Sequence, residues 1–82
     1  MTESTTVTLD VREMTPRERH PAIFARLDAL QPGEALRLVN DHDLQPLRYQ
    51  LLAEHPDLFS WESEQEGPGE WVIRIQKRGQ ER

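Results

Sequence analysis

Two stretches with the apolar spacing of a helix alternate with runs that have the period-two pattern of a strand, and each helical stretch opens on a proline. Thr6–Val11 and Glu34–Val39 alternate polar and apolar side chains, which is typical of a strand with one buried face. Helices are predicted from Pro21 and from Pro46, because proline suits the first helical position, where its missing N–H has no helical partner. The second helix is expected to end near His55.

The rest of the chain completes the pattern. The charged segment Arg12–Arg19 contains a proline and is predicted to be a loop, which places His20 at or beside the N-cap of the first helix. Phe59 and Trp61 lie on one face of a third predicted strand, and Glu66–Gly69 forms a turn into a fourth. The order β-α-β-α-β-β predicts an α/β fold, more closely an α+β two-layer sandwich. Right-handed β-α-β crossovers would place both helices on one face of the sheet.

Alternation also predicts which side chains form the core and which face solvent. The uncovered sheet face should be largely polar, as is usual for a solvated face. It is expected to carry Thr8, Arg37, Ser60, Glu62, Arg74 and Gln76. The shared core is predicted to contain Leu9, Phe24, Leu27, Leu36, Leu38, Leu47, Leu51 and Ile73.

The length of the chain limits the number of domains, and the lack of cysteine excludes thiol chemistry. With 82 residues the chain is expected to form one domain at residues 7–78, between a flexible N-terminal tail at 1–6 and a C-terminal tail at 79–82. No cysteine is present, which excludes thiol nucleophiles, persulfides and sulfur-ligated metals. A small cysteine-free domain without a signal-like start is expected in the cytoplasm, and no apolar run is long enough for a membrane helix.

Charge and size favour a binding module over an enzyme. The net charge of −5 disfavours nucleic acid as a partner, because affinity for nucleic acid comes mainly from neutralising phosphates. A domain of this size has a thin core and little room for a deep, water-excluding pocket. No residue is identified as catalytic, although histidine acid–base chemistry stays open as a weaker hypothesis.

Five segments resemble a bacterial family of unknown function, DUF2249. They are Leu9–Glu13, Arg19–Pro21, Ala29–Glu34, Val39–Asp43 and Pro46–Leu47. That family is similar in fold to the TusA-like sulfur carriers. The resemblance therefore implies a four-stranded mixed sheet in the order 1-2-4-3.

The same resemblance bears on chemistry and on partners. The carriers hold a persulfide on a cysteine before a proline at the start of their first helix, whereas here His20 precedes Pro21. Sulfur transfer therefore cannot be carried over. Relatives occur alone or beside hemerythrin-like domains, which implies hemerythrin-like partners and a setting of iron, nitric oxide or oxygen biology.

His20 and His42 are the strongest candidates for a site. Each follows a predicted strand and lies near the start of a predicted helix, so both should reach the sheet edge where open α/β sheets bind ligands. Asp41 and Asp43 surround His42, and Arg19 precedes His20, where it can help to bind an anion. A helix N-terminus would also bias His20 toward its neutral form.

Three interpretations of this edge stay open. It can contact a small ligand or a protein partner, or it can bind a divalent metal ion such as zinc or iron through His20, His42 and a carboxylate of Asp41 or Asp43. The third interpretation is purely structural, since asparagine, aspartate and histidine are common turn residues and Asp43 can cap the second helix. The leading hypothesis is a binding or accessory domain.

Overall fold

The elements follow the β-α-β-α-β-β order in a computed structural model that describes residues 6–78. The predicted tails at 1–6 and 79–82 lie outside these residues, apart from Thr6, which begins the first strand. The elements are β1 (Thr6–Asp10), α1 (Pro16–Ala29), β2 (Ala35–Asn40), α2 (Gln45–Glu54), β3 (Phe59–Glu66) and β4 (Trp71–Lys77).

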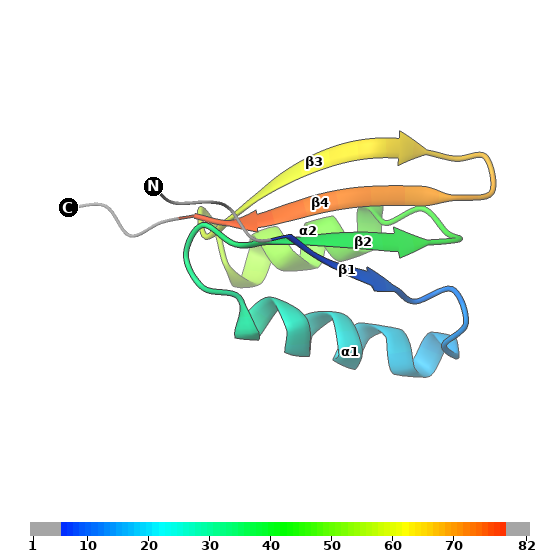
Figure 1. Cartoon of the computed structure of the whole chain (residues 1–82), viewed down its shortest axis with the longest axis horizontal. Helices are drawn as coiled ribbons and strands as arrows, with labels where there is room; N and C mark the ends of the chain where they lie inside the picture. Colours follow the sequence, from blue (N-terminus) through cyan, green and yellow to red (C-terminus); the bar gives the residue numbers. More distant parts are fainter. Residues whose placement is uncertain (1–5, 79–82) are drawn as a thin grey trace.

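The four strands form one mixed sheet in the order β1-β2-β4-β3, which confirms the predicted topology. β1 and β2 are parallel, with Leu9 opposite Leu38, whereas β4 runs antiparallel to both of its neighbours. Figure 1 shows both helices on the same side of the sheet, α1 along the β1 edge and α2 behind β2 and β4. Because β1 and β2 are parallel, the loops that follow them emerge at one end of the sheet.

The core lies between the helices and the covered face of the sheet. Seven of the eight predicted core residues are buried there: Leu9, Leu27, Leu36, Leu38, Leu47, Leu51 and Ile73. Phe24 is only partly buried and packs against the margin of this cluster.

The other face of the sheet is largely polar as predicted, but it also carries two buried valines. Thr8, Arg37 and Glu62 are exposed. An ion pair crosses this face from β2 to β3, with Arg37 Nε 2.8 Å from Glu64 Oε1. On the central strands, Val39 and Val72 are register partners that alternate with the core residues, and both are nevertheless buried.

The start of α1 differs from the prediction. The helix begins at Pro16 rather than at Pro21, so the second half of the predicted loop at Arg12–Arg19 is helical. Thr15 is the N-cap in an extended conformation, and Pro16 occupies the first helical position that had been assigned to Pro21. His20 therefore lies inside the helix, and the expected influence of a helix N-terminus on its protonation does not apply.

Local start signals and side-chain contacts both support a helix that continues across Pro21, because Thr15 is its N-cap and Glu18 lies in its first turn. A proline inside a helix removes one backbone hydrogen bond and crowds the preceding turn, which normally favours a helix that starts at the proline. Here Arg19, in the first turns of α1, donates hydrogen bonds to groups of the preceding loop and of the end of β2. These contacts hold the turn before Pro21 in place.

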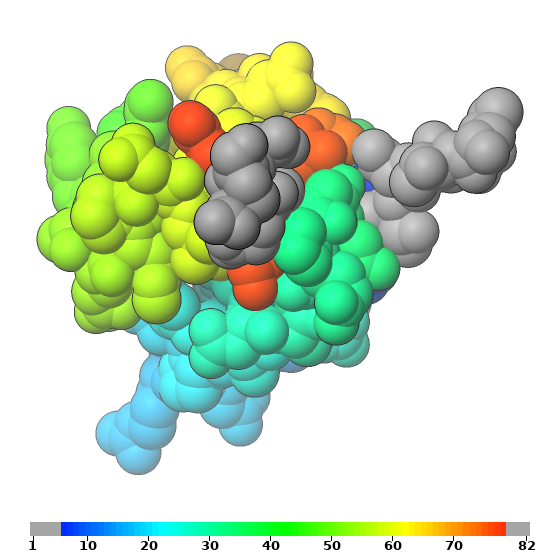
Figure 2. All heavy atoms as spheres, turned by 90° about the vertical axis from the view of Figure 1, so that its left-hand side faces the viewer, coloured from blue at the N-terminus to red at the C-terminus, as the bar shows by residue number. Residues whose placement is uncertain are grey.

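The opposite end of the sheet is closed by the loop after α1, which meets the end of β4 (Figure 2). Gly33 N donates to Lys77 O at 2.8 Å, and Lys77 N donates to Glu34 O at 2.9 Å. Gly33 has a φ of 92°, a value that side chains other than glycine rarely adopt. This end is tied by backbone hydrogen bonds between the loop after α1 and the end of β4.

Candidate functional site

The site is built on the two loops that follow the parallel strands. β1 ends at Asp10 and β2 at Asn40, and the loops behind them lead into α1 and α2. These loops lie together at one end of the molecule (Figure 1). The parallel pairing of β1 with β2 therefore brings the segments around His20 and His42 to the same edge of the sheet.

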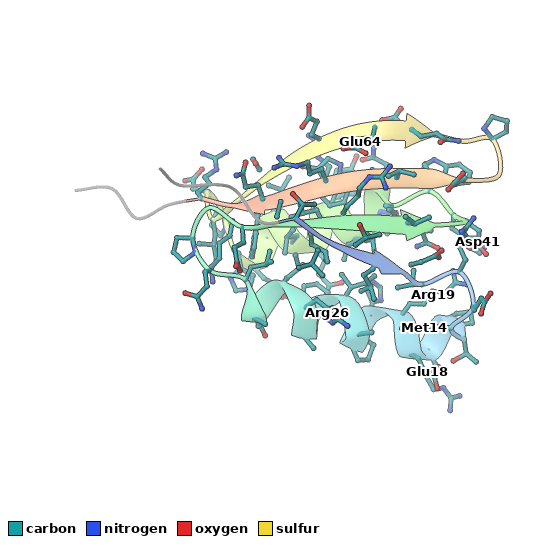
Figure 3. The ribbon with its side chains drawn as sticks, in the orientation of Figure 1. Met14, Glu18, Arg19, Arg26, Asp41 and Glu64 are labelled. Carbon is teal, nitrogen blue, oxygen red and sulfur yellow. The ribbon has the colours of Figure 1, made fainter. Side chains whose placement is uncertain are left out.

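Arg19 joins the two loops (Figure 3). Its Nε donates to Met14 O at 3.0 Å and its Nη2 donates to Arg12 O at 3.0 Å, both in the loop after β1. Its Nη1 donates to Asn40 Oδ1 and to Asp41 Oδ1, each at 2.8 Å. Only 13% of the Arg19 side chain is exposed. The guanidinium is thus directed at protein acceptors, and its role in the structure is that of a clamp.

Asp41 connects this clamp to His42. The hydrogen bond from Arg19 lowers the pKa of the Asp41 carboxyl below its ordinary value, and a weaker contribution in the same direction comes from His42. Nδ1 of His42 contacts Asp41 Oδ1. Because an ionised carboxylate can only accept, Nδ1 of His42 is assigned as the hydrogen-bearing nitrogen. In the neutral imidazole this leaves Nε2 as the acceptor.

A pocket with a volume of about 230 Å³ lies between the first half of α1 and the start of α2. We call it the histidine pocket. Its apolar walls come from both helices and from the loop before α2. They are formed by Pro16, Ile23, Leu44, Pro46 and Leu47.

Polar groups line the same pocket. His20 and His42 both take part, together with Arg19, Asn40 and Asp43. His42 is largely exposed, with 71% of its side chain accessible. His20 reaches the pocket from the second turn of α1, where its ring also packs at 6.0 Å from that of Phe24. The structure thus brings both histidines to one pocket although His20 is not an N-cap.

The two aspartates have different positions. Asp43 lines the pocket and accepts the backbone N–H of Gln45, the first residue of α2, at 3.0 Å. Asp41 does not line the pocket and instead holds His42 and Arg19. Within residues 6–78, no group of three or more histidine, cysteine or acidic side chains is arranged to hold a metal ion.

Asn40 is a site residue that the sequence argument passed over. It is the one buried polar or charged residue among those described, 6% exposed, and its Oδ1 accepts both from Arg19 and from the backbone N–H of Asp41. It lies two residues beyond Leu38 and hence on the covered face of β2. That alternation could have identified it, because a buried amide requires hydrogen-bond partners.

The fold and the pocket define a small two-layer α+β domain with one mixed sheet and a histidine-lined pocket beyond the ends of its parallel strands. The sequence profile of the family described as an uncharacterized conserved protein (DUF2249) matches residues 8–77. The chain belongs to this family. No curated protein and no solved structure matches it. Among residues 6–78, no helix is long and apolar enough to cross a membrane.

Proposed function

We propose that this chain is a small binding or accessory domain that uses the histidine pocket for a small ligand or for one group of a protein partner. The observation that supports this most directly is that His20 and His42, from separate elements, line one pocket with apolar walls. Pockets of this kind typically combine an apolar body with a few well-placed polar groups.

The chemistry of the lining indicates what would bind. Ile23, Leu44 and Leu47 suit an apolar body of a few atoms. The Asp41 contact fixes the ring of His42, so its Nε2 can accept a hydrogen bond from a hydroxyl or amine of the ligand. A phenol has both features and is therefore a suitable probe.

NMR titration with phenol tests this proposal, and His55 provides an internal control because it does not line the pocket. The ring signals of His20 and His42 should shift in a saturable manner while those of His55 stay in place. His42→Ala should weaken binding, whereas His55→Ala should not. Equal shifts of all three rings, or none at any phenol concentration, would contradict the proposal.

Divalent metal binding is a second candidate, favoured by the contact between Asp41 and His42. Metal-bound histidines usually donate their other ring N–H to a carboxylate or a carbonyl, as His42 does. His20 and His42 would supply two ligands, and water or a partner would complete the coordination. Titration with zinc or ferrous iron should then shift both rings together, and His20→Ala should abolish the response of His42. Independent or absent responses would exclude a shared ion.

We further propose a cytoplasmic, bacterial setting in which hemerythrin-like proteins are partners and the fold is related to that of TusA-like sulfur carriers. The support is the resemblance of the loop and helix-start segments, together with the lack of cysteine that separates this chain from sulfur transfer. Calorimetry with a hemerythrin-like protein tests the partner directly. Binding should weaken in the double variant His20→Ala/His42→Ala and persist in His55→Ala.

A further inference from the structure

A second pocket lies on the other side of the loop that leads into α2. Its volume is about 240 Å³, and it is bounded by the start of α2 and by the facing strands β3 and β4. Trp61 and Trp71 both line it. They are the two tryptophans of the chain. We call this space the indole pocket.

Trp61 has an unmet hydrogen-bonding requirement. Its Nε1 is the one buried side-chain nitrogen or oxygen within residues 6–78 that lacks a hydrogen-bond partner in the protein. A buried N–H without an acceptor is destabilising, and such groups in folded proteins call for a partner. Trp61 lines the indole pocket, and because its Nε1 is buried, a ligand oxygen becomes such a partner only when the surrounding side chains move to admit it.

The remaining polar lining consists of acceptors and carries negative charge. Glu66 and Asp43 contribute carboxylates, and Ser63 contributes a hydroxyl. Within residues 6–78, no hydrogen bond or ion pair engages the Glu66 carboxylate, whereas Asp43 accepts one backbone N–H at the start of α2. Two indole rings beside two carboxylates form an environment that favours a cation over an anion or a neutral molecule.

The ring of Trp61 already takes part in one interaction with a cation. The guanidinium carbon of Arg48 lies 5.8 Å from the centre of the ring. The Trp61 ring therefore already attracts a positive group in the folded protein. Recognition of organic ammonium ions by aromatic side chains depends on the same attraction to the ring face.

We propose that the indole pocket binds a small organic ammonium ion that also carries a hydroxyl group. The ammonium group lies against the indole rings and near Glu66 and Asp43, and the hydroxyl oxygen accepts the N–H of Trp61. This site uses other residues than the histidine pocket, apart from the shared Asp43 and Leu44. It is therefore independent of the function proposed above.

Choline is the probe, because it combines a quaternary ammonium with one hydroxyl. Both tryptophans line the pocket, so intrinsic fluorescence reports on it directly. Titration with choline chloride at constant ionic strength should change the fluorescence in a saturable manner. The neutral isostere 3,3-dimethyl-1-butanol, which has the same shape without the charge, should give no saturable change.

Two acidic residues of β3 provide matched variants. Glu66→Gln removes a charge from the pocket and should weaken choline binding about threefold, as expected for one partly exposed charge. Glu62→Gln removes the same charge from the opposite face of the strand and should leave the affinity unchanged. Equal weakening by both variants would show nonspecific attraction and would overturn the proposal.

The role of the Trp61 N–H is tested by comparing choline with tetramethylammonium, which lacks the hydroxyl. The unaltered protein should prefer choline, and Trp61→Phe should lose that preference while Trp71 still reports binding. If Trp61→Phe does not fold, the comparison of the two ligands on the unaltered protein decides the point. No saturable response to choline, an equal response to dimethylbutanol or equal affinity for the two cations would overturn the proposal.

Discussion

Replacement of Arg19 by alanine should be among the more destabilising single changes at the site. The side chain donates to the carbonyls of Arg12 and Met14 and to the side chains of Asn40 and Asp41. It is therefore the contact that joins the loop after β1 to the end of β2. Without it, the start of α1 loses the contacts that hold its first turn before the internal proline.

The expected loss of unfolding free energy depends on how exposed the acceptors of the Arg19 side chain are. Water can reach Asp41, whose side chain is 37% exposed, so that carboxylate can exchange its lost partner for solvent. Asn40 is 6% exposed, and a buried acceptor that loses a charged donor costs about 1.5–3 kcal/mol. We expect a total loss of about 2–3 kcal/mol of unfolding free energy. That is a large share of the roughly 4–12 kcal/mol typical of a domain of this length.

Urea denaturation followed by tryptophan fluorescence measures this loss. Arg17→Ala is the matched control, since Arg17 lies in the same turns of α1 and is exposed, and it should change the free energy by less than about 0.5 kcal/mol. Arg19→Lys should be intermediate, because an ammonium cannot reproduce the planar fork of the guanidinium. A loss for Arg19→Ala no larger than that for Arg17→Ala would refute the assignment of Arg19 as a clamp.

Three further predictions concern the core, the charge near β1 and the hairpin turn. Leu27→Ala should cost about 2–5 kcal/mol in chemical denaturation because it leaves a cavity in the core, and a loss below about 0.5 kcal/mol would contradict the packing of α1. The hydrogen bonds from Arg12 lower the pKa of Asp10 to about 2, so the stability that this pair contributes should be present above the unfolded value of 3.8 and be lost as the pH falls through about 2. Carboxyl NMR titration should show this midpoint, and Arg12→Ala should raise it toward 3.8. Gly67→Ala should destabilise more than Gly69→Ala in thermal unfolding, because both have positive φ but only at Gly67 would a Cβ meet a tryptophan ring, at 2.9 Å; equal losses would count against that contact.

The sequence by itself determined the order of the elements and the composition of the core. Period-two alternation in Thr6–Val11 and Glu34–Val39 identified the parallel strands to within about one residue, because each strand buries one face against helices. Leu27, Leu47 and Leu51 were assigned correctly for the same reason, since their helical spacing places them on one buried face. The sheet order followed from the family resemblance rather than from the alternation.

Only the tertiary structure decided how the site is assembled. Pro16 has the stronger local start signal, since Thr15 is the N-cap and Glu18 adds an acidic side chain to the first turn. Hydrogen bonds from Arg19 to groups as far along the chain as Asn40 and Asp41 support the same start. No pattern in the sequence states that such a distant pairing forms. The same contacts turned Arg19 from a candidate anion ligand into a clamp, and they placed His20 in the second turn of a helix that still reaches the pocket of His42. Local patterning fixes which face of an element is buried, whereas the partners of a polar side chain depend on which segments the folded sheet brings together.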